Sequence, residues 1–317
     1  MSGTMARLVL FRLGVMLVSL VIVAFAVFFA TEMLPGNVVE ILLGQSATPQ
    51  AVAALRHAMH LDQPAFVQFL HWLAGLLSGN LGHSYVNNIS VSTLIGERLA
   101  NSLRLAAITT VVSVPISLAL GITSAIFRGS LYDRIVSVVS ISVVSVPEFL
   151  VATTAVLIFA VQLQWLPALS LTNNVHGWFG QLKIYAMPVM TLSFVISAQM
   201  IRMTRAAVID TLNTPYCEMA LLKGSSRRRV VLRHALPNAL GPIANAVALS
   251  LSYLIGGVII VETIFDYPGM AKLMVDAVST RDIPLIQSCA MIFAITYLLL
   301  VTIADLMIIV SNPRLRK

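Results

Sequence analysis

The sequence predicts an all-α membrane protein with six transmembrane helices. Only 10% of its 317 residues are charged and the mean hydropathy is +0.91, whereas a soluble domain carries about 25% charged residues. Six apolar segments also follow one another along the chain. Each has at least about 18 residues, which is long enough to cross roughly 30 Å of hydrocarbon.

The first apolar segment follows Arg7 and Arg12, so a secretory signal peptide is an alternative interpretation. The segment is too long for the apolar part of such a peptide, and five further segments follow it, which favours a membrane span. The expected spans cover residues 13–31, 103–127, 135–161, 184–203, 239–261 and 286–310.

The basic residues predict the orientation of the spans. Lys and Arg gather at the N-terminus, at Arg128 and Arg134, in residues 202–233 and in the tail 314–317, and the connections between these regions contain few. Because cytoplasmic connections are enriched in Lys and Arg, we expect both termini and the 202–233 segment in the cytoplasm. The net charge of +7 therefore reflects topology, and nothing in the sequence indicates nucleic-acid binding.

Four parts are expected along the chain. They are an N-terminal cytoplasmic tail with the first transmembrane helix (1–31), an external helical segment (32–98), a transmembrane core (97–306) and a cytoplasmic tail (307–317). The external segment is too long to be a simple turn, so it should form structure of its own.

Two helices are expected in the external segment. Thr48 followed by Pro49 indicates a helix start, with a capping hydroxyl and a proline at the first helical position. Apolar residues then recur at helical spacing on a second helix, which either packs on the outer ends of the spans or docks a soluble partner. These residues are Phe66, Phe69, Leu70, Leu73, Leu76 and Leu77.

Prolines interrupt several expected spans. Each proline removes a backbone donor, so neighbouring helices or a wet cavity must satisfy the freed carbonyls, and a bundle broken this often is typical of a transporter. The chain also lacks a G-x-x-x-x-G-K-[ST] loop, so any nucleotide chemistry belongs to another chain, and we expect no catalytic residue. The prolines are Pro115, Pro147, Pro188, Pro237 and Pro242.

A short, sharply bounded helix is expected within the basic segment. Thr214 can cap it, Pro215 can occupy its first position, and Gly224 can take the left-handed conformation that ends a helix. Ser225 or Ser226 then caps a second helix that runs into the fifth span. Residues 214–226, called the knob below, contain several apolar side chains, which predicts that a protein surface covers them.

The knob resembles the signature of ABC importer permeases. In that signature a Glu-Ala-Ala triplet precedes a glycine and, ten to thirteen residues later, an Ile-x-Leu-Pro. Met219 stands here in place of the first alanine and His234 in place of the isoleucine. The matching residues are Glu218, Ala220, Gly224, Leu236 and Pro237.

The resemblance narrows to the dipeptide, oligopeptide and nickel branch of these permeases and covers nearly the whole chain. It rests on sequence blocks in the same order and at the same spacing. They are LPGN at 34–37, LDQPAFVQFLHWLAGLLSGNLGHS at 61–84, SVPEFL at 145–150, QWLPALS at 164–170, LLKGSSRRRVVLRHALPNAL at 221–240, VETIFDYPGMAKLMVDAVSTRDIPLIQ at 261–287 and NPRLR at 312–316.

This resemblance implies a type I ABC importer permease fold and import of peptides or peptide-like solutes across a bacterial inner membrane. It implies four kinds of partner: a second homologous permease, two ATP-binding subunits, an external substrate-binding protein and membrane lipid. ATP and Mg would be bound by the partner subunits, with no cofactor in this chain, which would not itself be an enzyme. The substrate could equally be a nickel chelate, glutathione or an opine.

By the same resemblance, the knob is the cytoplasmic coupling helix of a coupling segment at residues 202–237, and it docks into a separate ATPase subunit. The residues expected to couple the two subunits are Glu218, Met219, Ala220, Leu221, Lys223, Gly224, Leu236 and Pro237.

Glu148 follows Pro147 within the third expected span. An ionisable group at that depth usually faces the bundle interior or a water path. One interpretation is a pathway residue that meets the amino group of a peptide-like substrate. The other is a carboxyl group that satisfies the backbone freed by the proline.

Three acidic residues in the last external loop, Asp266, Asp276 and Asp282, are candidates for contact with a substrate-loaded binding protein, although a solvated acidic loop would have the same composition. Asp305 is expected to pair with a nearby basic residue. No metal site is expected, because the spacing of the external histidines fits no ligand motif. These are His57, His60, His71 and His83.

Two other classes of protein were weighed. An ion-coupled secondary transporter needs several intramembrane carboxylates or histidines, whereas this chain offers chiefly Glu148 and Asp305. A membrane-embedded hydrolase needs a nucleophile and a base at a recognisable spacing, which the sequence does not contain.

Overall fold

The computed structural model describes residues 3–33, 38–58, 62–171 and 177–311. Within these ranges every regular element is a helix, and one isolated β-bridge joins His83 and Ser90. The sequence blocks at 34–37 and 312–316 and the residue His60 lie outside the described residues. The expectation of an all-α protein is confirmed.

Among the described residues, five helices are long and apolar enough to cross a membrane, judged by length and composition, and a bent pair of helices supplies a sixth span if it is counted as one. They correspond in order to five of the six expected spans. The helices are α1 (Gly3–Glu32), α5 (Val91–Ile126), α8 (Trp178–Leu212), α11 (Leu236–Ile264) and α13 (Ile283–Ser311).

The third expected span, 135–161, is not one helix. Helix α6 (Leu131–Val144) ends before Pro147, and α7 (Glu148–Ala155) continues through a π-helical turn (Val156–Gln162) at an angle of 99° to α6. Proline cannot donate a backbone hydrogen bond and disfavours the helical conformation of the residue before it, so the helix breaks there.

The other prolines do not break their spans, which corrects the expectation of a bundle interrupted at many points. Pro115, Pro188 and Pro242 lie inside α5, α8 and α11. Pro237 lies in the first turn of α11, directly after the π-helical turn Val231–Ala235, and the helix continues through it.

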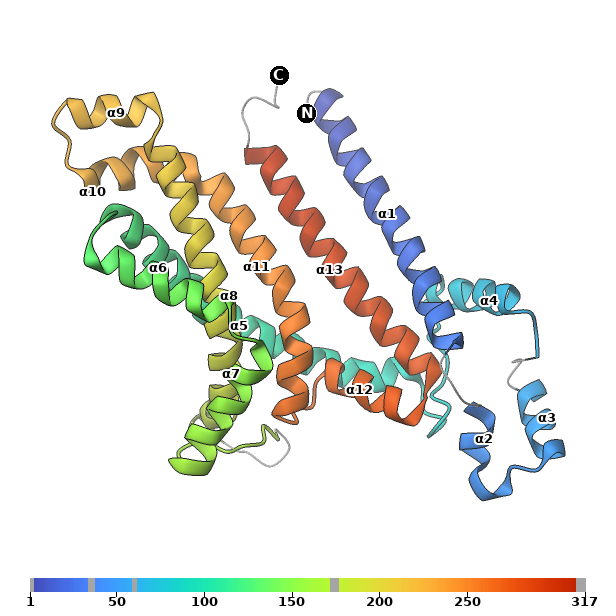
Figure 1. Ribbon diagram of the computed structural model, residues 1–317. Helices are drawn as coiled ribbons and strands as arrows, with labels where there is room; N and C mark the ends of the chain where they lie inside the picture. Colours follow the sequence, from blue (N-terminus) through green and yellow to red (C-terminus); the bar gives the residue numbers. More distant parts are fainter. Residues whose placement is uncertain (1–2, 34–37, 59–61, 172–176, 312–317) are drawn as a thin grey trace. The chain divides into compact units, whose positions relative to one another are not determined.

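The chain forms two compact units. Unit 1 contains residues 1–14, 103–267 and 297–317. In it α8 packs against α11 and α6, and α7 packs against α8 and α11 (Figure 1). The part of α5 in this unit approaches α8 closely, because a Cβ atom built on Gly121 would lie 2.8 Å from the Cβ of Thr204.

Unit 2 contains residues 15–102 and 268–296. Besides parts of α1, α5 and α13, it holds the short helices α2 (Val38–Leu43), α3 (Pro49–Ala58), α4 (Ala65–Leu77) and α12 (Met270–Thr280). Helix α3 begins as the sequence predicts, since the Thr48 hydroxyl accepts a hydrogen bond from the Ala51 amide at 3.2 Å.

Helix α4 of unit 2 packs on two of the long helices. The Phe69 side chain is buried with Phe28 of α1 and Met291 of α13, and the Phe69 and Phe28 ring centroids lie 5.5 Å apart. The helix therefore packs on the spans, which agrees with the first of the two interpretations of the sequence. Phe66, Leu70 and Leu77 remain exposed on its other side.

Candidate functional site

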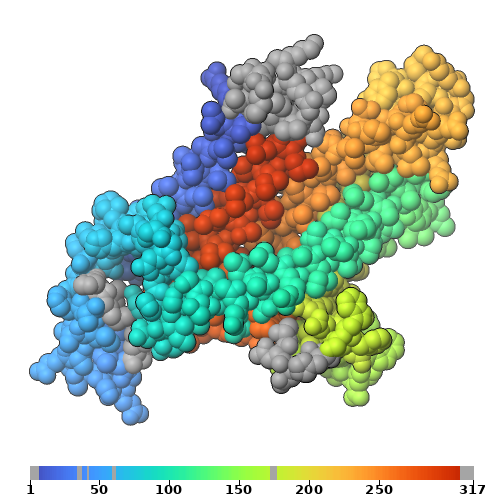
Figure 2. Space-filling model, turned by 180° about the vertical axis from the view of Figure 1, so that it is seen from behind, coloured from blue at the N-terminus to red at the C-terminus, as the bar shows by residue number. Residues whose placement is uncertain are grey.

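The knob joins α8 to α11, the two helices that pack together in unit 1 (Figure 1). After α8 the chain forms α9 (Pro215–Leu222), turns, forms α10 (Arg227–Val230) and passes through a π-helical turn (Val231–Ala235) into α11. On the face seen in Figure 2, no other described part of unit 1 covers the surface of this region. The predicted pair of short helices is therefore present, with α10 running on into the fifth span.

The two helices of the knob begin at the predicted residues but without the predicted side-chain caps. Thr214 has the extended conformation of a cap (φ −85°, ψ 147°), yet its hydroxyl donates to the Thr211 carbonyl at 2.5 Å. Ser226 is likewise extended, and its side chain makes no capping bond. The starts are thus set by backbone conformation and by Pro215, whose missing amide hydrogen would have been unpaired in any case.

Gly224 ends α9 in the left-handed conformation that the sequence predicts, with φ +82°. The Ser225 amide donates to the Ala220 carbonyl at 3.2 Å and the Gly224 amide to the Leu221 carbonyl at 2.9 Å. These two bonds form a Schellman motif, which satisfies carbonyls at the end of the helix. No described residue lies within 4 Å of a Cβ atom built on Gly224, so the requirement for glycine comes from backbone conformation.

One side of the knob is fixed to the rest of unit 1. The Cys217 side chain is fully buried in a cluster that includes Val208 of α8 and Val230 of α10. Ala220 and Leu236, two of the predicted coupling residues, also pack against this cluster. Because a close-packed interior resists deformation, α9 should move together with the ends of α8 and α11.

The opposite side of α9 is an exposed surface that is largely apolar. The sequence analysis did not include Leu222 among the coupling residues, although this side chain is 83% exposed. It lies three residues after Met219, and that helical spacing could have identified it. The other exposed side chains on α9 and its end are Tyr216, Glu218, Met219, Leu221 and Lys223.

The connection from the knob into α11 contains the Leu236 and Pro237 of the signature. Pro237 is exposed in the first turn of α11 and has no amide hydrogen for the preceding turn. The Asn238 side-chain amide donates to the His234 carbonyl at 2.8 Å. This bond gives the carbonyl a partner at the point where the π-helical turn meets α11.

A buried ion pair, which the sequence analysis missed, joins α6 to α8. The Arg205 Nε and Nη2 atoms donate to the two Asp133 carboxylate oxygens at 2.7 and 2.9 Å. The carboxylate also accepts from the Ser124 hydroxyl and from the Gly129 amide, the latter at 2.9 Å. Of the two residues, only Asp133 could have been noticed in the sequence. It stands three residues after Ser130, the cap of α6, and an acidic residue at that spacing is typical of a helix start.

Glu148 is the first residue of α7, directly after the break at Pro147. Its carboxylate contacts α11, since a Cβ atom built on Gly257 would lie 3.0 Å from the Glu148 Oε2 atom. The side chain is partly buried, and among the described residues it has no hydrogen bond or ion pair. The second sequence interpretation required the carboxyl group to satisfy the backbone freed by Pro147. Within the described residues it does not do so.

The three acidic candidates of the last external loop differ in their surroundings. Asp282 is 2% exposed, and its carboxylate accepts hydrogen bonds from the Ser84 hydroxyl and from the Tyr85 amide at 3.0 Å. It therefore holds unit 2 together and cannot meet a soluble protein, which corrects the prediction for this residue. Asp276 is exposed and pairs with Lys272 at 2.7 Å, and Asp266 has a positive φ of 47° after α11.

Two of the remaining ionisable candidates are paired. Asp305 of α13 forms an ion pair with Arg12 of α1 at 2.9 Å, which confirms the expected basic partner. The His57 ring lies 2.6 Å from the Asp62 carboxylate. Across the described residues, no group of three or more His, Cys, Asp or Glu side chains is positioned to hold a metal ion.

A bundle of long apolar helices with one broken span and a fixed, outward-facing knob is the architecture of a transport permease. Residues 117–317 match the family of binding-protein-dependent transport system inner membrane components. Residues 5–106 match the N-terminal region of such membrane components. The chain belongs to this family, and it is therefore a multi-pass component of the inner membrane in a family of transport permeases.

Similar proteins from several bacteria cover nearly the whole chain. The Glutathione transport system permease protein GsiC of Salmonella choleraesuis is 34% identical over 98% of this chain and 99% of its own length. The protein of that name from Escherichia coli (strain K12) is 33% identical over the same shares. The Probable peptide ABC transporter permease protein y4tP of Sinorhizobium fredii is 33% identical over 97% of this chain and 98% of its own.

Proposed function

We propose that this chain is the permease subunit of an ATP-driven importer for peptides or peptide-like solutes, with the knob as the site that receives the force of ATP hydrolysis. The observation that carries the proposal is that one side of α9 is buried in unit 1 and the opposite side is exposed and apolar. Cys217 anchors one side in the core of unit 1, while Met219 and Leu222 expose apolar surface on the other. Exposed apolar surface of this kind is favourable only when a partner covers it.

The substrate class follows from the relatives. Two of the names given above are those of glutathione permeases and one is that of a peptide permease, and both substrates are peptides or peptide-like. The partners we propose are two ATPase subunits, which bind ATP and Mg, a second homologous permease, an external substrate-binding protein and the surrounding lipid. The orientation we propose places both termini and the knob in the cytoplasm, because the basic residues gather there.

A pathway through unit 1 is proposed near the break between α6 and α7. A cavity of about 490 Å³ lies between α5, α6 and α8, and its lining is mostly apolar, with Ser140, Ser193 and Ser197 as the polar residues. Glu148 and Pro147 stand at the break itself. In alternating access, closure of the ATPases would move the knobs, and the helices around this break would open toward the substrate.

Substitution of Leu222 tests the proposed function. Leu222→Glu should leave the permease in the membrane, because the side chain is 83% exposed within this chain. It should abolish recovery of the ATPase subunits with the tagged permease, because the substitution places a charge in an apolar interface. Leu222→Met is the matched control and should retain recovery. Equal recovery with Leu222→Glu and the parent would refute the coupling role.

A second experiment, uptake in proteoliposomes, separates this proposal from an ion-coupled secondary transporter. A secondary transporter would transport in proteoliposomes that contain the permease alone and an ion gradient. The proposed importer would require the ATPase subunits and ATP. Uptake driven by the gradient alone would therefore favour the alternative.

A further inference from the structure

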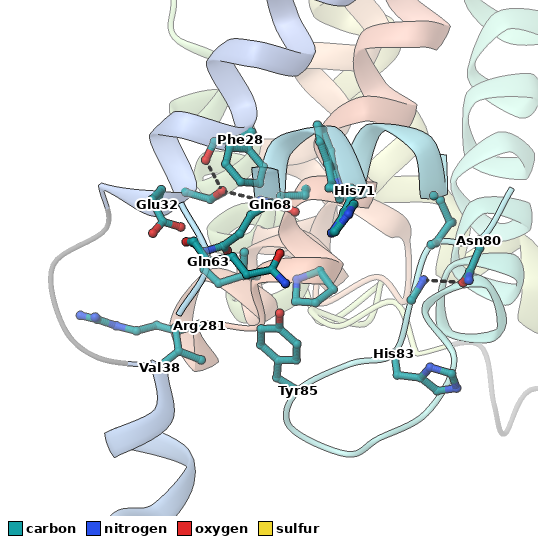
Figure 3. A pocket seen from close by; sticks show the side chains of 18 of the residues that line it. Phe28, Glu32, Val38, Gln63, Gln68, His71, Asn80, His83, Tyr85 and Arg281 are labelled. Carbon is teal, nitrogen blue, oxygen red and sulfur yellow. Dashed lines mark hydrogen bonds between the residues drawn. The ribbon is translucent and has the colours of Figure 1, made fainter. Parts of the chain in front are cut away.

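Unit 2 contains a polar cavity that the transport cycle described above does not use. Its volume is about 630 Å³, which lies within the range of about 300–1,000 Å³ that is usual for small-molecule sites. Residues from α1, α4, the chain after α4 and the start of α13 line it, and all of them belong to unit 2. Figure 3 shows the cavity from close by.

Two polar atoms at this cavity are buried and have no hydrogen-bond partner among the described residues. They are the Nη1 atom of Arg281, which is a donor, and the Oε1 atom of Gln63, which is an acceptor. A buried polar group without a partner is costly, so native proteins rarely keep one without a ligand, an ion or a water to satisfy it. The cavity therefore fits a ligand that brings both an acceptor and a donor.

Charge at the cavity specifies the ligand further. Three charged residues line it, Glu32, Arg56 and Arg281, and Arg56 already has an interaction of its own. Glu32 and Arg281 line the same side (Figure 3), and neither forms an ion pair with a described residue. A carboxylate suits the planar guanidinium of arginine, and an ammonium group suits a glutamate carboxylate. An α-amino acid carries both groups on one carbon, which matches two opposite charges on one side of a cavity.

The remaining walls fit the rest of such a molecule. Phe28 and Trp72 supply apolar surface, and the Tyr85 hydroxyl and the Gln63 amide point into the same space (Figure 3). Burial, together with the nearby carboxylates of Asp282 and Glu32, raises the pKa of Tyr85, so its hydroxyl stays neutral and can donate. His71 and His83 lie on the side away from Glu32.

We infer that this cavity binds the zwitterionic head group of an α-amino acid, either as the free amino acid or as part of a larger solute. Arg281 would hold the carboxylate, while Glu32 and the Gln63 side-chain oxygen would hold the ammonium group. The binding rests on unit 2 alone, whereas a role for it in import rests on the proposed function.

Equilibrium dialysis of the purified full chain in lipid nanodiscs, with radiolabelled L-glutamine as the probe, tests the inference. We expect saturable binding that L-glutamine methyl ester and N-acetyl-L-glutamine displace about tenfold less well, because each lacks one charged group of the head. Alanyl-alanine, whose charges lie on different residues, should also compete poorly. No saturable binding, or equal displacement by all of these compounds, would overturn the site. None of these measurements depends on a variant that must fold.

Two variants identify the residues. Arg281 has a left-handed backbone with φ +56°, and asparagine tolerates this conformation. Arg281→Asn should therefore fold normally and weaken binding of L-glutamine about tenfold or more. Arg281→Lys should restore part of the affinity, because it restores the charge.

The matched control is Lys272→Gln, which removes a cation of the same unit that does not line the cavity. It should leave the affinity unchanged, and an equal loss in Lys272→Gln and Arg281→Asn would overturn the assignment. The dialysis contains no ATPase, so a knob that does not couple to the ATPase would leave these results unaltered. Failure of the proposed function is therefore distinguishable from failure of the proposed binding site.

Discussion

Two acidic residues of unit 1, Asp133 and Glu148, begin the two halves of the bent pair α6–α7 and have opposite surroundings. Each stands in the first turn of its helix, where the helix dipole favours a negative charge. Asp133 accepts four hydrogen bonds, two of them from Arg205. Glu148 makes none with a described residue. The contrast separates an acid with a structural role from an acid that is available to bind.

The difference teaches how the two regions can serve transport. Around Asp133 the loop after α5, the start of α6 and the C-terminal part of α8 are joined by one carboxylate, and α8 leads directly into the knob. At Glu148 the helix is broken, and the carboxyl group has no hydrogen bond or ion pair with a described residue. A fixed region can transmit motion, whereas a broken helix with an unpaired charge can change its contacts when a substrate arrives.

The largest effect on stability should come from Asp133→Ala. It leaves the Arg205 guanidinium partly buried without its partner, and breaking a buried ion pair in this way costs about 3–5 kcal/mol. We expect a lowered thermal unfolding temperature and poor recovery from the membrane. Asp276→Ala, which breaks an exposed pair with Lys272, is the control and should cost less than about 1 kcal/mol. Equal losses of stability from the two substitutions would show that Asp133 has no special structural role.

Gly121→Ala should have the next largest effect, because it tests the close approach of α5 to α8 in unit 1. The new Cβ atom would lie 2.8 Å from the Thr204 Cβ and 3.0 Å from the Ile201 carbonyl oxygen, so one helix must shift. Overpacking of this kind costs about 1–3 kcal/mol in the free energy of unfolding.

Gly96→Ala in the same helix is the control, because nothing lies within 4 Å of its new Cβ atom. It should be neutral or stabilising by up to about 1 kcal/mol. Thermal unfolding in detergent measures both variants. If Gly121→Ala is as stable as Gly96→Ala, the two helices are not in the contact described.

The smallest effect on stability should come from Glu148→Gln, although its effect on transport should be clear. Because the carboxylate has no partner among the described residues, loss of its charge should change the unfolding free energy by less than about 1 kcal/mol. Uptake of peptide substrates should become slower or change in preference, since the charge lies at span depth. Unchanged uptake of every tested substrate would show that Glu148 has no role in the pathway.

Local patterns made much of this structure predictable. Pro215 and Gly224 bound α9 because each has a backbone preference that acts at its own position, and apolar length alone identified five spans. The predicted capping bonds of Thr214 and Ser226 are absent. A hydroxyl can donate to a nearby carbonyl and not accept from an amide, as Thr214 does with the Thr211 carbonyl.

Contacts between distant residues could not be predicted in the same way. Arg205 and Asp133 are 72 positions apart, and Asp282 meets Ser84 across 198, so neither pair leaves a pattern in one sequence. The sequence analysis consequently assigned Asp282 to an exposed surface and missed the ion pair. The break at Pro147 was predicted, but breaks were also predicted at Pro115, Pro188 and Pro242, which lie within continuous helices. A proline in the sequence therefore did not show which span bends.

The central claim is that the knob couples the permease to its ATPase. Gly224 gives the most direct test, because only its backbone conformation requires glycine. Gly224→Val is strained in the left-handed region by roughly 1 kcal/mol or more, whereas Gly224→Asn adopts that region readily. Both variants should insert into the membrane, and Glu218→Ala on the same helix should have a milder effect than Gly224→Val.

The decisive measurement is the amount of ATPase that co-purifies with each variant, together with ATP-driven uptake in the same membranes. We predict that Gly224→Val loses uptake and most of the co-purified ATPase, while Gly224→Asn retains most of both. Full uptake and full ATPase recovery with Gly224→Val would contradict the coupling role of the knob.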